Sequence, residues 1–282
     1  MKQCSVIIPA HNEEALIGNC IESILANQQT FEGELEIIVV ANACTDSTTE
    51  IAKNYNEVKV IETEQKGKPN ALNLGDSAAS YFPRVYVDGD LVLSNNVVHE
   101  LTKDLSDKNI KITSPRLMID VAKIKNKLIK NHYEFWLSLP HIKDFLVGGG
   151  VYAINRKSRK AFDKFPDILS DDGYIKALFD EKERKINKNC FMYMHTPNKI
   201  EDMIYQRIRW TAGELELKNK YPHLFHKREN YYKNIVKHII NEGLNEPTKL
   251  LTHFIIYFAG KVGGRLKYYF GDMNYWNRIQ RP

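Results

Sequence analysis

Short apolar runs alternate with amphipathic stretches over residues 4–88, and this alternation constrains the fold more than any other feature. Runs rich in β-branched residues, typical of buried strands, cover residues 4–9, 35–40, 58–61 and 84–88. Helical spacing of apolar residues falls between them, over residues 13–26, 46–55 and 69–80. Thr45 or Asp46 is expected to cap the second of these helices. The alternation predicts an α/β fold, with a mostly parallel sheet flanked by helices.

The residues that follow each predicted strand are the first candidates for function, because such sheets bind ligands beyond the carboxyl ends of their strands. Small and polar residues gather at all four ends, in the stretches PAHNEE (9–14), ANACTD (41–46), QKGKPNALNLG (65–75) and DGD (88–90). Neither a GxGxxG nor a P-loop pattern occurs in the sequence, which argues against dinucleotide binding and ATP hydrolysis.

The fourth predicted strand ends in two carboxylates, Asp88 and Asp90, separated by one glycine. Gly89 allows a tight turn or the close approach of a ligand. Two carboxylates so placed suit Mg²⁺ or Mn²⁺ bound together with substrate phosphates. Asp-Gly is also a hairpin signal, so a solvated turn is the alternative for this tripeptide taken alone.

The charge of the chain is unevenly placed. The net charge is +5, but residues 211–282 alone carry twelve Lys/Arg against six Asp/Glu. A basic end of this kind indicates an anionic partner, such as a membrane surface or a nucleic acid. No nucleic-acid recognition module is visible, so we expect no nucleic-acid partner.

Cysteine usage and hydropathy favour a cytoplasmic location. The four cysteines show neither zinc-site spacing nor a disulfide framework, which indicates a reducing compartment. The chain runs from Met1 directly into a predicted strand, so no signal peptide is expected. The longest apolar stretch, residues 250–260, contains His253 and is too short to span a bilayer.

The stretches VIIPAHNEE, EIIVVANACTDST, GKPNALNLG and VDGD, in this order and spacing, resemble the nucleotide-sugar-binding half of family 2 glycosyltransferases with the GT-A fold. The resemblance implies a nucleoside diphosphate-sugar donor, most often a UDP-sugar, and Mn²⁺ or Mg²⁺ at the DxD pair. It places Pro9, Ala10 and Glu13 at the base and ribose, Lys66 or Lys68 near the base or diphosphate, Asp88 at the ribose and metal, and Asp90 as the main metal ligand. For each lysine, a solvated surface charge is the alternative.

One position departs from the family pattern. The acidic pair that usually follows the second strand is replaced by Ala41-Asn42. The Asn42 amide both donates and accepts, so we expect it to hydrogen-bond a pyrimidine edge.

The middle of the chain contains predicted helices over residues 97–105 and 119–139. The second carries four lysines beside apolar residues, for which phosphate contact, lipid contact and a solvated face are alternatives. Its aromatic residues (His132, Tyr133, Phe135 and Trp136) are expected in the core. Three glycines follow at 148–150, as expected where a ligand or another backbone comes close. By resemblance Gly149 lies near the donor sugar and acceptor; a bend without contacts is the alternative.

An acidic pair follows at Asp171 and Asp172. Glycosyl transfer needs a group that takes the proton of the acceptor hydroxyl. The pair resembles the Glu-Asp element of the family, which makes Asp172 the base and Asp171 the alternate. A helix start capped by Ser170 is the purely structural alternative.

The stretch QRIRW lies in a predicted helix over residues 200–218 and matches the QxxRW motif of the family. Gln206, Arg209 and Trp210 are three and four residues apart and share one helical face. Arginine can grip a diphosphate and Trp can stack on a sugar, with Arg207 assisting. His195 is either a further metal ligand, a diphosphate contact or a structural histidine.

A basic, aromatic segment ends the chain, with a helix predicted from Pro247. A segment of this kind can lie in the headgroup region of a membrane, which implies a peripheral contact through residues 247–282. Packing against the catalytic domain is the alternative.

We therefore expect a GT-A catalytic domain over residues 1–215, divided into a nucleotide-sugar half (1–93) and an acceptor half (94–215), and a helical extension over residues 216–282. The expected activity is inverting, metal-dependent transfer from a nucleoside diphosphate-sugar to a saccharide or lipid-linked acceptor in polysaccharide biosynthesis. A catalytically silent subunit of a membrane polysaccharide complex and a sugar-1-phosphate nucleotidyltransferase are the alternatives.

Overall fold

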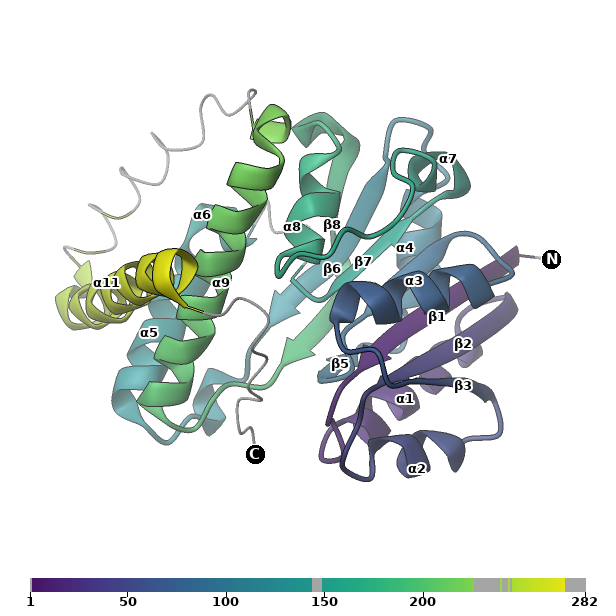
Figure 1. Ribbon diagram of the computed structural model, residues 1–282, viewed down its shortest axis with the longest axis horizontal. Helices are drawn as coiled ribbons and strands as arrows, with labels where there is room; N and C mark the ends of the chain where they lie inside the picture. Colours follow the sequence, from purple (N-terminus) through teal and green to yellow (C-terminus); the bar gives the residue numbers. More distant parts are fainter. Residues whose placement is uncertain (1, 144–148, 226–238, 240–242, 244, 272–282) are drawn as a thin grey trace. The chain divides into compact units, whose positions relative to one another are not determined.

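The computed structural model describes residues 2–143, 149–225, 239, 243 and 245–271 (Figure 1). The chain forms two compact units. The first comprises residues 1–118, 147–167 and 178–194, and the second comprises residues 119–146, 168–177 and 195–282.

The first unit is built on a mixed sheet. Within the described residues this sheet has eight strands in the order β3-β2-β1-β4-β7-β6-β8-β5. Their bounds are β1 Lys2–Ala10, β2 Gly33–Asn42, β3 Val58–Thr63, β4 Arg84–Val87, β5 Leu91–Leu93, β6 Ile112–Met118, β7 Val151–Ile154 and β8 Arg184–Met194. The first four strands pair in parallel, as the alternation of strands and helices predicts. The pairs β4–β7, β6–β7 and β5–β8 are antiparallel.

The central strand β1 explains why the sheet forms in this order. Its residues Val6, Ile7 and Ile8 are fully buried, so both faces of the strand need cover. β2 and β4 flank it in parallel register, which brings their carboxyl ends to the same edge of the sheet. α3 lies close over β1, because a Cβ on Gly75 would stand 2.5 Å from the Ile7 side chain.

The helices of the first unit follow the predicted order, but the first two begin later than expected. They are α1 Ile17–Leu25, α2 Thr48–Lys53, α3 Lys68–Ala78, α4 Val97–Asp104 and α7 Arg156–Arg159, with 3-10 turns η1 Ala26–Gln29 and η3 Glu181–Glu183. α3 crosses the face of the sheet that is toward the viewer in Figure 1, whereas α1 contacts α2 and η1 contacts α4.

Two predicted helix starts are wrong, for one physical reason. Residues 13–16 do not belong to α1, and α2 begins two residues after Asp46, with Ser47 and not Thr45 or Asp46 in the cap position. The intervening residues hold two loops together instead, since the Glu13 amide donates to Thr48 Oγ1 at 2.7 Å. Asp46 still accepts from the Thr48 amide at 3.0 Å.

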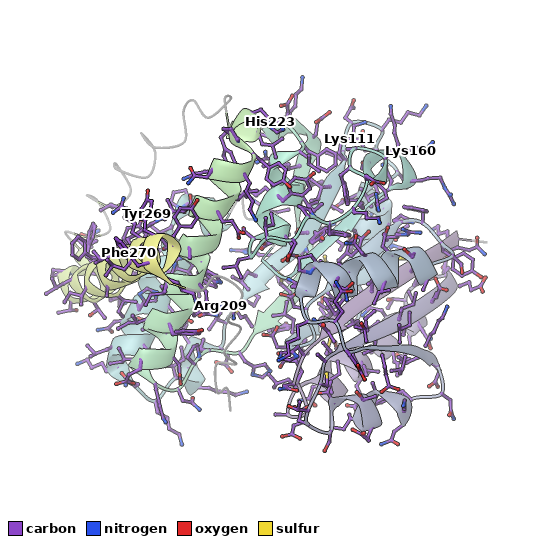
Figure 2. The ribbon with its side chains drawn as sticks, in the orientation of Figure 1. Lys111, Lys160, Arg209, His223, Tyr269 and Phe270 are labelled. Atoms are coloured by element: carbon purple, nitrogen blue, oxygen red, sulfur yellow. The ribbon has the colours of Figure 1, made fainter. Side chains whose placement is uncertain are left out.

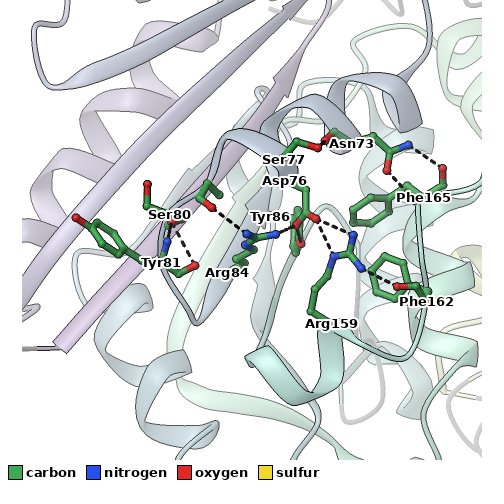
Figure 3. Close-up of polar contacts among 12 residues, drawn as sticks. Asn73, Asp76, Ser77, Ser80, Tyr81, Arg84, Tyr86, Arg159, Phe162 and Phe165 are labelled. Carbon is green, nitrogen blue, oxygen red and sulfur yellow. Dashed lines mark hydrogen bonds and ion pairs between the residues drawn. The ribbon is translucent and has the colours of Figure 1, made fainter.

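A buried ionic network ties α3, β4 and α7 together (Figure 3). Asp76 of α3 accepts from Tyr86 Oη at 2.6 Å and from Arg159 Nε at 2.8 Å, and it pairs with Arg84. Arg159 also donates to the Phe162 carbonyl at 2.7 Å, which fixes the loop after α7. Two guanidinium groups and one hydroxyl surround the Asp76 carboxylate, so its buried charge is compensated.

The second unit is helical. Its described elements are η2 Val121–Lys123, α5 Lys127–Ser138, α6 Pro140–Lys143, α8 Asp171–Ala177, α9 Ile200–Lys220, η4 Pro222–Phe225 and α11 Pro247–Phe270. α11 packs across α9 and α5 (Figure 1). The predicted start at Pro247 is confirmed. The predicted single helix over 119–139 is wrong, because Asn126 is extended and its side chain caps α5 by accepting from Leu128 and Ile129 amides.

The expected boundaries at 93/94 and 215/216 do not coincide with these units. Residues 94–194 supply β6, β7 and β8 to the same sheet as β1, and α9 continues through residue 215 to Lys220. The functional division into donor and acceptor halves stays a prediction. Among the described helices, none combines the length and the apolar character that crossing a bilayer requires.

Candidate active site

Eight predicted donor-side residues belong to one edge of the first unit. We call them the strand-end cluster: Pro9, Ala10, Glu13, Asn42, Lys68, Asp88, Asp90 and Gly149. They lie at or just beyond the carboxyl ends of β1, β2 and β4, at the start of α3 and just before β7. Parallel pairing of Ala10 with Ala41 aligns the ends of β1 and β2, so these loops emerge side by side.

The loops after β1 and β2 are locked to each other. Asn12 Oδ1 accepts from the Thr45 amide at 2.7 Å, and His11 Nδ1 lies 2.6 Å from the Asn42 carbonyl. Asn12 and Ala43 both adopt positive φ, 53° and 48°, which is costly for residues with a Cβ. Backbone outliers at two adjoining loops are typical of a functional edge. The turn preference of asparagine was readable from the sequence, whereas nothing in the sequence marked Ala43.

Asn42 lies at the base of these loops and is almost fully enclosed. The residue is only 4% exposed, and no donor among the described residues hydrogen-bonds its Oδ1 atom. A buried acceptor without a donor costs free energy unless a ligand or water supplies one. Pro9 and Ala10 beside it are buried, and Glu13 is half-buried.

Asp88 is held in place from both sides. Lys68 Nζ lies 2.7 Å from Asp88 Oδ1, with side-chain exposures of 18% and 34%. Lys68 is the first residue of α3, so the positive end of this helix also faces the pair. Lys66, the alternative, is exposed. The Leu91 amide donates to the Asp88 carbonyl at 3.1 Å, which closes the turn that carries Asp90.

The glycine segment before β7 lies against this turn. The Gly150 carbonyl accepts from the Asp88 amide at 2.8 Å. Gly149 and Gly150 have φ of 65° and 94°, and a Cβ on Gly150 would stand 2.6 Å from Leu91 Cδ1 and 3.0 Å from Asp88 Oδ2. The close backbone approach predicted for this segment is confirmed for Gly150. Gly148 lies outside the described residues.

The carboxylates fit a divalent cation only together with substrate oxygens. Over the described ranges, no group of three or more His, Cys, Asp and Glu side chains is placed to hold a metal. Asp88 and Asp90 are hard oxygen donors one residue apart, the set that Mg²⁺ or Mn²⁺ uses when phosphates complete its shell. His195 belongs to the second unit and is half-buried; burial and the nearby Lys123 charge lower its pKa. Its role as a metal ligand stays a prediction.

The acidic pair starts α8 in the second unit. Asp171 is buried, and Asp172 is half-buried and accepts from the Gly173 amide at 2.7 Å. The preceding loop is fixed to α9, because the Leu169 amide donates to Glu216 Oε2 at 2.9 Å and Gly213 leaves room for Ser170. The Tyr174 amide donates to the Ser170 carbonyl at 3.0 Å, which places Ser170 immediately before the first residue of α8.

The QRIRW stretch lies on α9. Gln206 is buried and accepts from Tyr133 Oη of α5 at 3.4 Å. Arg209 is half-buried (Figure 2), and Trp210 is 41% exposed with its ring 6.0 Å from that of Trp136. Gln206 and Trp210, one turn apart, therefore both contact α5.

The Arg207 guanidinium packs against two neighbouring indole rings. Its guanidinium carbon lies 5.1 Å from the Trp136 ring centre and 4.8 Å from that of Trp210. Its Nη2 lies 2.9 Å from His132 Nε2, so His132 accepts as a neutral imidazole, and burial lowers the pKa of His132. Burial also lowers the pKa of Arg207, to about 10. His132 and Trp136 were expected only as core residues, and both are buried.

The family model of glycosyl transferase family 2 matches residues 5–173, which is more than half of the chain. The chain belongs to glycosyl transferase family 2. The match contains the strand-end cluster and the acidic pair, and it ends before QRIRW.

Among the relatives of this family 2 member is a poly-beta-1,6-N-acetyl-D-glucosamine synthase from Staphylococcus epidermidis. It is 26% identical over 248 residues, which cover 81% of this chain and 59% of the synthase. The chain thus spans about three fifths of the length of that relative.

Two solved structures of other glycosyltransferases share the fold. A mannosyltransferase from Pyrobaculum calidifontis in complex with GDP-Man and Mn²⁺ superposes with a TM-score of 0.66 at 18% identity, over 95% of this chain and 87% of that one. The glucosyl-3-phosphoglycerate synthase from Mycobacterium tuberculosis with Mn²⁺ and UDP-glucose gives 0.53 at 21% identity, over 76% and 78%. The family 2 chain therefore has the GT-A fold.

Proposed function

We propose that this protein is an inverting, metal-dependent glycosyltransferase that moves a sugar from a nucleoside diphosphate-sugar, most often UDP-linked, to a hydroxyl of a saccharide or lipid-linked acceptor. The observation that carries the proposal is the Lys68–Asp88 pair at the first turn of α3. A carboxylate, an ammonium and a helix N-terminus at one point suit a metal-bound diphosphate. The ligands of the two structural neighbours, GDP-Man or UDP-glucose with Mn²⁺, support this class of donor.

The base of the donor is assigned to the loops after β1 and β2. Pro9 and Ala10 supply a small apolar surface, and Glu13 the ribose contact. The Asn42 Oδ1 atom accepts the ring N–H of a pyrimidine, while its amide donates to a neighbouring carbonyl. This assignment accounts for a buried acceptor that has no donor among the described residues.

The diphosphate is assigned to Lys68, Asp88 and Asp90. A Mn²⁺ or Mg²⁺ ion held by the two carboxylates would neutralise charge on the leaving nucleoside diphosphate. When the donor binds, the Lys68 ammonium leaves Asp88 and pairs with a phosphate oxygen. The diphosphate or acceptor is assigned to Gln206, Arg207 and Arg209. The sugar ring is assigned to Trp210, and the sugar and acceptor to Gly149. His195 is assigned to the metal or diphosphate.

Proton removal is assigned to Asp172, with Asp171 as the alternate. Asp172 is the more exposed of the two, whereas Asp171 is 3% exposed and suited to supporting the helix start. The acceptor oxygen attacks the anomeric carbon opposite the leaving diphosphate and Asp172 takes its proton, so the configuration inverts.

We also assign the protein to polysaccharide synthesis at the cytoplasmic face of a membrane, with peripheral contact through residues 247–282. The name of the Staphylococcus epidermidis relative supports a saccharide product, and the basic end of the chain supports the contact. Residues 272–282 lie outside the described part of the structure.

The test is product analysis with UDP-, GDP-, CDP- and dTDP-sugars in the presence of Mn²⁺ and short oligosaccharide acceptors. We expect release of one nucleoside diphosphate and, by NMR, a product with inverted anomeric configuration. Release of pyrophosphate from a nucleoside triphosphate and a sugar 1-phosphate would instead identify a nucleotidyltransferase. No turnover of any donor would indicate the silent subunit and overturn the proposal.

A further inference from the structure

Helix α11 packs with its small and polar residues inward. Its buried residues are Thr252, His253, Ile256, Gly260 and Gly264, of which only Ile256 has a bulky apolar side chain. An ordinary surface helix buries its apolar face and exposes its polar one. The orientation of α11 is therefore the reverse of what its composition alone predicts.

The glycines of α11 fix this orientation. A Cβ on Gly260 would stand 2.5 Å from Arg207 Cβ of α9, and one on Gly263 would stand 2.7 Å from Ile208 Cδ1. A Cβ on Gly264 would collide with Thr211. Only glycine allows the two helices to approach this closely, so rotating α11 to bury another face would lose the contact.

The opposite side of α11 is a continuous apolar stripe, which we call the α11 outer face. It consists of Leu251, Ile255, Phe258, Val262, Leu266 and Tyr269. Steps of three and four residues place these side chains along one line, about 27 Å long at 1.5 Å per residue. Each is between 38% and 69% exposed. Figure 2 labels Tyr269 and Phe270 at the end of this helix. An apolar patch of this extent marks an interaction surface.

The charges of α11 select the occupant of this face. The helix contains Lys249, Lys261, Arg265 and Lys267 and no Asp or Glu from Pro247 to Phe270. Lys249 pairs with Glu134 and Lys261 with Glu214, both at 3.0 Å, whereas Arg265 is exposed and no ion pair to it occurs among the described residues. A second copy packed on this face would bury Arg265 beside the stripe, and α11 offers no acidic residue to pair with it, which disfavours a symmetric dimer.

We propose that the α11 outer face lies in the headgroup region of an anionic lipid bilayer, parallel to its surface. This deepens the peripheral membrane contact proposed above by naming the face and its orientation. Aromatic rings that carry a hydroxyl, such as Tyr269, suit this depth, and Arg265 beside the stripe meets anionic headgroups. Vesicle binding needs neither donor nor acceptor, so it is tested separately from glycosyl transfer.

The test is flotation of the full chain with phosphatidylcholine vesicles, with and without phosphatidylglycerol. We expect flotation with the anionic vesicles, weakened by high salt, and little with phosphatidylcholine alone. The double variant Ile255→Ser/Phe258→Ser should bind the anionic vesicles at least about tenfold more weakly than wild type, because two apolar side chains are removed from the stripe. The matched control Met118→Ser/Tyr193→Ser removes two exposed apolar side chains of the first unit and should bind like wild type.

Light scattering and thermal unfolding complete the design. All variants change exposed side chains, so their unfolding midpoints should match wild type. Wild type that stays unbound to anionic vesicles, or a double variant that binds as well as wild type, would overturn the proposal. A wild-type dimer that the double variant converts to a monomer would assign the face to a second copy instead.

Discussion

The Lys68 ammonium lies 2.7 Å from the Asp88 carboxylate, at the point where the first residue of α3 meets the end of β4. A lysine in the first turn of a helix opposes the helix dipole, and Asp88 offsets this cost. The same pair neutralises one of the two proposed metal ligands. In the proposed mechanism, metal and donor diphosphate therefore exchange partners with Lys68 when they bind.

This exchange predicts opposite effects of Lys68→Ala on metal and on donor. Without the competing ammonium, Mn²⁺ alone should bind several-fold more tightly. The nucleoside diphosphate should bind about 10- to 100-fold more weakly, since a charge-assisted hydrogen bond is lost. Calorimetric titration measures both affinities. Lys66→Ala, which removes an exposed lysine two residues away, is the control and should change neither. Parallel weakening of both affinities would contradict the exchange.

Asp172→Asn should separate donor binding from transfer. The amide cannot take the acceptor proton, so turnover should fall by about 10²–10⁴. The donor affinity should stay within about twofold of wild type, because the change removes no proposed donor contact. Initial rates and a donor titration on the same preparation check this. Near-normal turnover in this variant would refute the role of Asp172.

Gly150→Ala should damage the Asp88 turn beyond the cost of backbone strain. Alanine at φ of 94° is strained by about 1–2 kcal/mol, and its Cβ would also press on Leu91 and Asp88. Gly67→Ala is the matched control, because Gly67 also has positive φ, 127°, but no atom lies within 4 Å of the added Cβ. Urea unfolding should show a larger loss for Gly150→Ala. Equal losses would mean that the close approach contributes nothing.

Asp76→Asn should destabilise the first unit by about 3–5 kcal/mol, because it leaves two buried guanidinium groups without their carboxylate. Burial opposes ionisation of Asp76, but hydrogen bonds from Arg159, Tyr86 and Arg84 outweigh it and lower its pKa. Because the pKa of Asp76 is lower in the folded protein than in the unfolded chain, where it is about 3.9, its ionised form stabilises the fold. This stabilisation is fully present above the pKa of the unfolded chain and is lost as the pH falls through the pKa of the folded protein.

The difference in unfolding free energy between wild type and Asp76→Asn should therefore be constant above about pH 5 and shrink below about pH 4. Urea titrations across this range measure it. Asp163→Asn, at an exposed aspartate, should stay within about 0.5 kcal/mol of wild type throughout. A difference that grows toward acid pH would contradict the assigned direction.

The parallel core of the sheet was predictable because its strands are short continuous apolar runs, rich in β-branched residues, that alternate with amphipathic stretches. Helix starts were not predictable where polar side chains stabilise a loop instead. Asn126, for example, caps α5 and so divides the predicted helix over 119–139. The Asp76 network was also beyond reach, since Arg159 is 83 residues away in sequence. For α11 the apolar pattern was plain, but which face turns inward depends on glycine contacts with α9.

The strand-end cluster was predictable from position, because polar residues at the ends of parallel strands must meet at one edge. The sequence did not reveal that Lys68 forms an ion pair with Asp88, since that contact depends on where α3 begins. Nor did it reveal that Arg207 packs against two indole rings, since this contact depends on the packing of α5 on α9.

The most direct measurement is a thermal-shift panel of UDP-, GDP-, CDP- and dTDP-sugars, each with and without Mn²⁺, on wild type and Asp90→Ala. A ligand that binds the native state raises the midpoint by mass action. We predict a rise with one nucleotide family, present only with Mn²⁺ and absent in Asp90→Ala. No rise with any donor, or an equal rise without metal and in Asp90→Ala, would contradict a metal-dependent donor site at the strand-end cluster.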